Sequence, residues 1–226
     1  MTQQWFNWDN KFLQMPGLWV LQDFLSPEIY QRIQNEIRNT PAEWHNRYTG
    51  REISEHGNYP NCQELAGRLI PYLHGLLSGN YKCVTIRAYR DYSDSWFFPH
   101  LDGKDFAVNV QIYMPESDRD ELGTQFCINQ QKNQLAETDE HGFRDYMKFD
   151  ENEFFTVPFR ANWGYINDNT QRKIHKTLTV PENYMRESIH FNFAFKQWPV
   201  EYGNDAGLEL NWYRRIGIVV PPKEQL

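Results

Sequence analysis

Cysteine is scarce in this sequence, and none of the cysteines has the spacing of a metal or redox motif. The three that occur, Cys62, Cys83 and Cys127, are odd in number and far apart, with no CxxC pair. Disulfide scaffolds and zinc fingers both require paired cysteines at short or regular spacings. We therefore expect reduced thiols and no disulfide framework.

The sequence also lacks an excess of basic residues and lacks long apolar runs. It has 23 Lys and Arg against 30 Asp and Glu, which gives a formal net charge of −7. Proteins that hold nucleic acid or anionic membranes through charge need the opposite balance. No apolar run approaches the roughly 20 residues that cross a bilayer. Residues 1–14 contain neither a basic leader nor an apolar stretch, so we expect a cytoplasmic protein with no nucleic-acid partner and no membrane partner.

Aromatic residues, in contrast, are abundant. The chain has 8 Trp, 13 Tyr and 15 Phe among 226 residues, and 40% of its residues are hydrophobic. Such a composition favours strands and wide concave pockets, and the length is sufficient for one well-formed core. We expect a single domain over residues 1–226.

The N-terminal part of the chain is predicted to be mainly helical. One or two short strands are expected between Trp5 and Leu25. A helix is expected from Ser26 to about Asn39, because Ser26 can cap it, Pro27 suits the first turn, and isoleucines then recur four residues apart.

A polar, turn-rich segment and a second helix complete this part. Thr40–Pro60 is expected to be a surface loop that could reach a site. Leucines at helical spacing predict a helix over Asn61–Leu77, kinked or broken at Pro71 and closing at Gly79.

After Gly79 the hydrophobic pattern changes from helical to alternating. Eight short strands after a helical region predict a sandwich or jelly roll backed by N-terminal helices. The long polar stretch Asn129–Asn152 is a candidate lid between strands, and the tail after Pro199 is expected to pack back on the body. The expected strands are Lys82–Tyr89, Phe97–Asp102, Ala107–Met114, Thr124–Asn129, Glu153–Val157, Trp163–Asn167, Lys173–Val180 and Ser188–Phe195.

The clearest chemical signal is the pair His100 and Asp102, separated by one residue on an expected strand. A chain with 7 His and 30 acidic residues contains about one His-x-acid pair by chance, so the pair alone indicates little. The strand context adds weight, because residues two apart on a strand point to the same face. Together with His175, much later in the chain, they would make two histidines and one carboxylate, the arrangement by which non-haem Fe(II) keeps adjacent coordination positions open.

A second signal is an arginine on the last expected strand. Polar and aromatic residues alternate strictly from Ser188 to Phe195. If the phenylalanines pack against the helices, Ser188 faces a polar interior, and so does Arg186 by the same parity. A buried unpaired charge is very costly, so Arg186 must meet an anion there. That anion is either an internal Asp or Glu or a ligand carboxylate held by both arms of the guanidinium.

Taken in order, these motifs resemble the Fe(II)- and 2-oxoglutarate-dependent dioxygenases, with the closest motif order in the prolyl-hydroxylase-like branch. The resemblance covers about residues 84 to 195. The matching elements are Arg87-Ala88-Tyr89, Pro99-His100-Leu101-Asp102, Val110-Gln111-Ile112-Tyr113, Gly123-Thr124, His175 and Arg186-Glu187-Ser188.

The resemblance implies a fold and a cofactor set. The fold would be mainly β with flanking α, a double-stranded β-helix of the jelly-roll or cupin-like type backed by N-terminal helices. Its barrel core would span about residues 82–196, its helical support 1–81 and a C-terminal extension 197–226. The cofactor would be Fe(II), with 2-oxoglutarate and O2 as co-substrates and ascorbate as a candidate addition. The reaction implied is hydroxylation of an unactivated C–H bond of a peptidyl residue, an amino acid or a small metabolite, with release of succinate and CO2.

The resemblance also assigns roles to individual residues. His100, Asp102 and His175 would bind iron. Arg186, with help from Ser188, would pair with the distal carboxylate of 2-oxoglutarate. The same co-substrate would be contacted by Tyr113 and Tyr89, and the alternative for each of them is a core aromatic residue.

Two alternatives keep the jelly roll without the redox step. One is a metal-binding or sugar-binding module that is not an oxygenase, which has no need of Arg186. The other is a metal-dependent hydrolase or isomerase that works with zinc and without oxygen. Neither explains why an arginine and a serine follow His175 at this spacing.

The remaining histidines are interpreted more plainly. Four of them have no partner at ligand spacing and are expected to be solvated or packing residues: His45, His56, His74 and His141. His190 shares the expected interior face with Ser188, so it is either a pocket residue or a hydrogen-bonded structural one.

Overall fold

The computed structural model describes most of the chain up to residue 197. The described residues are 4–7, 9–40, 45–48, 50–54, 59–93, 95, 97–100, 102, 106–128, 153–171 and 173–197. The segment expected as a lid, Asn129–Asn152, and the tail after Pro199 lie outside them. No helix within these ranges has the length and hydropathy needed to cross a membrane.

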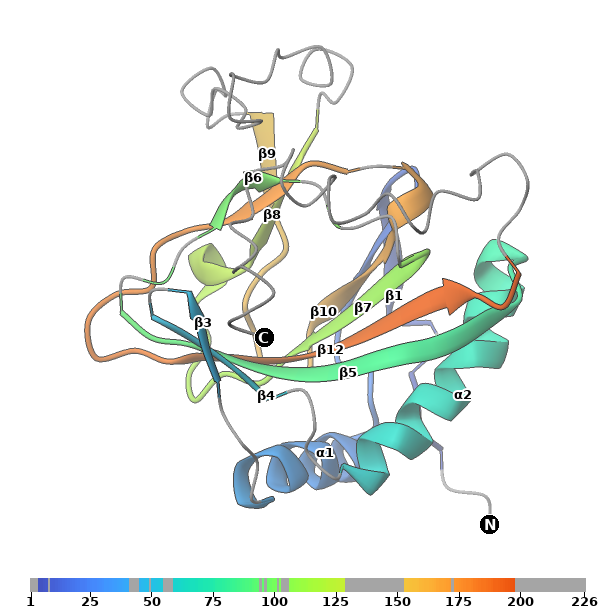
Figure 1. Cartoon of the computed structure of the whole chain (residues 1–226), viewed down its shortest axis with the longest axis horizontal. Helices are drawn as coiled ribbons and strands as arrows, with labels where there is room; N and C mark the ends of the chain where they lie inside the picture. The colour runs from blue at the N-terminus through green and yellow to red at the C-terminus, as the bar shows by residue number, and fades with distance from the viewer. Residues whose placement is uncertain are drawn as a thin grey trace, which may run out of the picture.

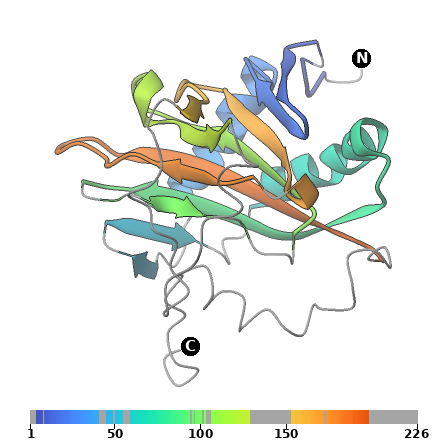
Figure 2. The ribbon, with the colours of Figure 1, turned by 90° about the horizontal axis from the view of Figure 1, so that it is seen from above.

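Two antiparallel sheets form a β-sandwich (Figure 1). The larger sheet has eight strands, and Figure 2 shows them side by side, with β1 and β2 at one edge and β3 and β4 at the other. Its order is β1 (Lys11–Met15), β2 (Leu18–Leu21), β10 (Gly164–Asp168), β7 (Val108–Tyr113), β12 (Arg186–Phe195), β5 (Tyr81–Asp91), β4 (Arg51–Ser54) and β3 (His45–Tyr48). The smaller sheet has the order β6 (Phe97–His100), β11 (His175–Thr177), β8 (Thr124–Cys127) and β9 (Phe154–Thr156).

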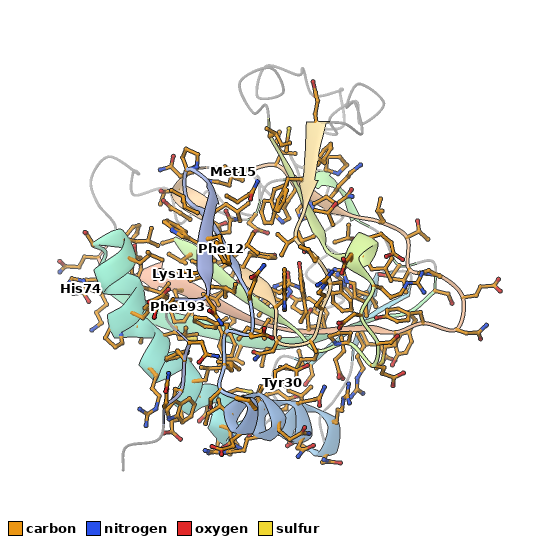
Figure 3. The ribbon with its side chains drawn as sticks, turned by 180° about the vertical axis from the view of Figure 1, so that it is seen from behind. Lys11, Phe12, Met15, Tyr30, His74 and Phe193 are labelled. Carbon is orange, nitrogen blue, oxygen red and sulfur yellow. The ribbon has the colours of Figure 1, made fainter. Side chains whose placement is uncertain are left out.

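Two helices cover the outer face of the larger sheet, on the side away from the smaller sheet (Figure 1). They are α1 (Pro27–Asn39) and α2 (Pro60–Leu77), and short 3-10 turns occur at Asp120–Leu122 and Asn169–Gln171. Buried isoleucines of α1 and leucines of α2 pack against the apolar face of β7 and β12, where Phe193 lies on the side of α2 (Figure 3). Each such buried side chain contributes about 1.5–3 kcal/mol, so this layer is the main source of stability.

The inner face of the larger sheet points to the smaller sheet and is largely polar. Residues that are directly paired across strands share a face, so the pairing register identifies the inward side chains. Hydrogen bonds from Thr124 on β8 to Gln111 and Tyr113 on β7 confirm which face is inside. The inward residues are Tyr165 and Asn167 on β10, Asn109, Gln111 and Tyr113 on β7, Arg186, Ser188, His190 and Asn192 on β12, Arg87, Tyr89 and Asp91 on β5, and Arg51 on β4.

The mainly β architecture and the strand pattern after Gly79 agree with the sequence prediction. All eight expected strands are present as β5 to β12, with ends shifted by a few residues. The extension of β5 to Asp91 and of β12 back to Arg186 matters most, because it brings these two residues into direct register.

The N-terminal predictions need three corrections. The expected loop Thr40–Pro60 contains the β3–β4 hairpin, which was missed because β4 offers a single aliphatic residue, Ile53. The second helix continues through Pro71 without a break, since buried leucines on both sides hold it to the sheet. Ser26 occupies the N-cap position of α1, but its side chain makes no capping hydrogen bond.

Gly164 marks a point where β10 and β7 approach too closely for a side chain. A Cβ atom built there would overlap the carbonyl oxygen of Gln111. We expect Gly164→Ala to lower the free energy of unfolding by about 2 kcal/mol or more, because the two strands must separate. Urea denaturation monitored by circular dichroism would measure the change.

The matched control is Gly67→Ala on α2. This glycine is solvent-exposed and has open space around its Cα atom. Alanine there should raise the free energy of unfolding by about 0.5–1 kcal/mol through helix propensity. Equal stabilities for the two alanine variants would contradict the close strand approach at Gly164.

Candidate functional site

The two candidate ligand histidines lie directly opposite each other on neighbouring strands of the smaller sheet. His100 ends β6, His175 begins β11, and the two are paired in register. Their ring centroids are 4.3 Å apart. Together with Asp102 they form a group in which one possible donor atom of each residue lies within 4.8 Å of the others. The structure therefore brings together the three residues expected to bind a metal.

Asp102 is not positioned by strand alternation, as was expected from the sequence. The strand β6 ends at His100, so alternation along a strand does not position Asp102. Its carboxylate is held instead by the side-chain amide of Asn109, which donates to Oδ2. The other oxygen, Oδ1, lies 3.5 Å from Nε2 of His175.

The ring of His175 has a defined orientation. Its Nδ1 lies 3.1 Å from the carbonyl oxygen of Lys173, and because a carbonyl can only accept, Nδ1 is the donor in this contact. The other ring nitrogen, Nε2, is the one that lies near Asp102. A backbone carbonyl on the second ring nitrogen is the usual way in which a protein orients a metal-binding imidazole. Two imidazoles and one carboxylate form a donor set suited to non-haem Fe(II).

Three buried asparagine side chains form a hydrogen-bonded chain that ends at Asp102. Asn109 accepts at Oδ1 from Asn169 Nδ2 at 3.0 Å, and Asn169 accepts in turn from Asn167 Nδ2 at 2.6 Å. None of these three asparagines was predicted from the sequence. The inward position of Asn109, two residues before Gln111 on the same strand, is the one signal that could have indicated it.

Arg186 lies on the inner face and is almost completely buried, with 2% of its surface exposed. Its Nη1 donates to the carbonyl oxygen of Leu122 at 3.1 Å, and its Nε lies 3.2 Å from Oδ2 of Asp91. Of the two anions considered from the sequence, an internal carboxylate is thus present. However, Asp91 is already engaged by both arms of the Arg51 guanidinium, with Nη2 to Oδ2 at 2.7 Å.

This three-residue cluster carries a net positive charge. Burial by itself would raise the pKa of Asp91, but Arg51 and Arg186 outweigh it and lower the pKa, so the carboxylate stays ionised. Two buried guanidinium groups therefore share one carboxylate, so these three residues together carry one more positive than negative charge.

Ser188 and Tyr113 lie beside Arg186 and have hydroxyl groups that accept hydrogen bonds from the protein. Gln111 Nε2 donates to Ser188 Oγ at 2.9 Å, and the backbone N–H of Thr124 donates to Tyr113 Oη at 2.9 Å. Burial raises the pKa of Tyr113, so its phenol keeps its proton. Each hydroxyl therefore retains a proton that it can donate to an anion.

Tyr165 on β10 faces the same interior and was not identified from the sequence. Its ring lies between those of Tyr113, at a centroid distance of 6.4 Å, and Phe126, at 4.9 Å. Burial, with smaller contributions from Tyr113 and Asp102, raises the pKa of Tyr165 well above its usual value. Tyr165 is thus a neutral hydrogen-bonding group near both the metal-ligand cluster and Arg186.

Tyr89 also faces the interior, directly opposite Ser188. Its ring contacts that of His190 at a centroid distance of 4.3 Å, and the guanidinium carbon of Arg51 lies 4.9 Å from the Tyr89 ring centroid. The pKa of His190 is lowered well below its usual value, by burial first and then by Arg51, Arg186 and Arg87. His190 is therefore a neutral residue of the inner face.

The other histidines contribute nothing to this site within the described residues. His74 is exposed on α2, on the outside of the molecule (Figure 3), where its Nδ1 lies 2.9 Å from the carbonyl oxygen of Gly79. His56 and His141 lie outside the described residues, as does the side chain of His45.

Comparison with known proteins finds similarity in structure but not in sequence. No family model and no curated protein sequence matches this chain. HygX from Streptomyces hygroscopicus, bound to nickel, 2-oxoglutarate and hygromycin B, superposes with a TM-score of 0.62 over 84% of this chain and 86% of its own, at 13% identity.

Two further structures superpose with similar TM-scores and sequence identities. An oxidoreductase of the 2OG-Fe(II) oxygenase family from Burkholderia pseudomallei has a TM-score of 0.56 at 13% identity, over 80% of this chain and 87% of its own. The epimerase SnoN from nogalamycin biosynthesis, described as non-heme and alpha ketoglutarate dependent, has a TM-score of 0.56 at 12% identity, over 79% and 76% of the two chains. The chain therefore shares the fold of these three structures.

Proposed function

We propose that this protein is an Fe(II)- and 2-oxoglutarate-dependent oxygenase. One observation carries the proposal: two histidines and an aspartate with converging donor atoms share the interior of the sandwich with a buried arginine whose charge is only partly offset. The fold supports it, since HygX has been crystallised with nickel and 2-oxoglutarate and with iron, and SnoN with Fe3+ and alpha ketoglutarate.

The proposed roles follow from the contacts of each residue. His100, Asp102 and His175 would hold the iron, with Asn109 fixing the carboxylate and the Lys173 carbonyl fixing the ring of His175. When bound, iron and 2-oxoglutarate supply the activation of O2, coupled to decarboxylation of the co-substrate to succinate and CO2.

The proposed co-substrate anchor lies on β12, on the inner face of the larger sheet. Arg186 would pair with the distal carboxylate of 2-oxoglutarate, and Ser188 and Tyr113 would donate their hydroxyl protons to it. Tyr89 and Tyr165 would line the same pocket. The aromatic cluster between the sheets, which includes Phe126 and Phe159, excludes water and so strengthens these charged contacts.

The reaction we propose is hydroxylation of an unactivated C–H bond in a small molecule. HygX was crystallised with hygromycin B and SnoN with nogalamycin RO, which favours a small metabolite over a peptidyl residue. SnoN is an epimerase, so the product must be identified directly: hydroxylation adds one oxygen atom to the substrate, whereas epimerisation leaves its mass unchanged.

We also propose that residues 1–226 form one oxygenase domain with a double-stranded β-helix core of the prolyl-hydroxylase-like branch. Strands β5 to β12 support this core, because they pass between the two sheets in a regular order, with four strands in each. The branch assignment depends on the motif order from Arg87 to Ser188. The N-terminal 81 residues add β1 to β4 as well as the helices.

The proposal is tested by anaerobic titration of the metal-free protein, first with Fe(II) and then with 2-oxoglutarate. Chelation of iron by the co-substrate gives a weak visible charge-transfer band, which we expect to saturate at one equivalent per chain. Iron binding without the band would favour a metal-binding module, and activity with zinc in the absence of oxygen would favour a hydrolase or isomerase.

A further inference from the structure

Three charged residues lie in one row across three neighbouring strands of the larger sheet. Arg51 on β4 is paired in register with Asp91 on β5, and Asp91 is paired in register with Arg186 on β12. All three are buried, with exposed fractions of 9%, 1% and 2% respectively. The carboxylate therefore lies between two guanidinium groups, with little solvent to screen any of the charges.

The two arginines do not share Asp91 equally. Arg51 engages both carboxylate oxygens, whereas the contact with Arg186 is a single approach of Nε to Oδ2 at 3.2 Å. This approach lacks hydrogen-bond geometry, and among the described residues no acceptor makes a hydrogen bond to Arg186 Nε. A two-armed contact between guanidinium and carboxylate is the stronger of these geometries.

Asp91 is consequently both a neighbour and a competitor of the proposed anchor. A carboxylate this close to Arg186 can neutralise the charge that 2-oxoglutarate would need. It is restrained from doing so because Arg51 occupies its two oxygens. Arg51 also packs its guanidinium on the ring of Tyr89, another residue proposed to face the co-substrate.

We propose that Arg51 is a positioning residue of the co-substrate site, which holds Asp91 and so leaves the charge of Arg186 available to a carboxylate of 2-oxoglutarate. This inference rests on the proposed function. Through Arg51, the β3–β4 hairpin at the edge of the sheet would influence the affinity for 2-oxoglutarate. Arg51 itself would not contact the co-substrate.

The test is a double-mutant cycle on the affinity for 2-oxoglutarate, measured on the Fe(II)-loaded protein without oxygen. Arg51→Met releases Asp91 to pair with Arg186, and the dissociation constant should rise by about tenfold or more, as for loss of a hydrogen bond to a charged group. Fe(II) affinity should not change. Adding Asp91→Asn removes the competing charge, so the double variant should recover to within about threefold of the wild type.

A purely structural role for Arg51 gives a different pattern. The double variant would then bind 2-oxoglutarate no better than Arg51→Met, and this result would overturn the inference. If Arg51→Met fails to fold, the same cycle with Arg51→Lys decides, because lysine keeps the charge but loses the two-armed contact. In that cycle we expect a smaller rise in the dissociation constant and the same recovery with Asp91→Asn.

The matched control is Arg160→Met, which removes another two-armed pair, between Arg160 and Asp120, from the surface. It should leave 2-oxoglutarate affinity unchanged. A wild-type protein that binds iron but not 2-oxoglutarate would overturn the proposed function and this inference together. Wild-type binding with no effect of Arg51→Met would overturn the inference alone.

Discussion

Replacing His175 by alanine should abolish iron binding and, with it, the charge-transfer band and all turnover. The ring supplies one of three converging donors, and the Lys173 carbonyl orients it through a contact with Nδ1. Loss of a residue that merely supports a ligand weakens metal affinity by about 10- to 100-fold, so loss of the ligand itself should exceed that range. Equilibrium dialysis against Fe(II) under anaerobic conditions measures the effect.

The matched control is His74→Ala, which removes an exposed histidine of α2. It should bind Fe(II) as the wild type does. Because His175 is buried between Phe126 and His100, the folded state of the variant is checked by circular dichroism before dialysis. A folded His175→Ala protein with wild-type iron affinity would show that the cluster is not the metal site.

The second large effect is expected for Arg186→Met, which should weaken 2-oxoglutarate binding by about a hundredfold while leaving Fe(II) affinity intact. The substitution keeps most of the apolar stem and removes the guanidinium that we propose to pair with the distal carboxylate. Charge-assisted contacts of this kind, made by a buried guanidinium, are each worth about 1.5–3 kcal/mol, and Arg186 can make two of them. Titration of the charge-transfer band with 2-oxoglutarate gives the affinity directly.

The free energy of unfolding of Arg186→Met distinguishes loss of the co-substrate anchor from damage to the core. Without Arg186, Asp91 and Arg51 form a one-to-one pair and the cluster becomes neutral. Removing an unmatched buried charge should leave the free energy of unfolding unchanged or higher in the absence of co-substrate. Normal 2-oxoglutarate binding by Arg186→Met would contradict the proposed anchor. Arg186→Lys should retain only part of the affinity, because lysine lacks the planar, two-armed guanidinium.

Much of the fold could be predicted because each strand carries its own local signal. The strict alternation from Ser188 to Phe195 indicated correctly that the phenylalanines face the helices and that Arg186 and Ser188 face inward. Periodicity likewise located both helices. The β3–β4 hairpin gave no such signal, because its pairing with β5 is decided by topology and not by a hydrophobic pattern.

The three residues proposed as ligands could be predicted from the sequence, whereas the residues that contact them could not. His100, Asp102 and His175 could be named from the motif order, and the structure brings their donor atoms together. Asn109 and Asp91 could not be identified, because an Asn or Asp on a strand looks the same whether it supports a ligand or faces solvent. Their importance depends on partners that are distant in sequence, such as Asn169 and Arg51.

The two N-terminal hairpins have a practical consequence for any attempt to trim this protein. They flank the larger sheet on both sides, with β2 pairing to β10 and β4 pairing to β5. A fragment starting at residue 82 would leave β10 and β5 as open edges and would uncover the phenylalanine face of β12. Open edges beside exposed aromatic surface are templates for aggregation. The smallest unit that can be produced in isolation, or exchanged as a module between proteins, must therefore begin before β1.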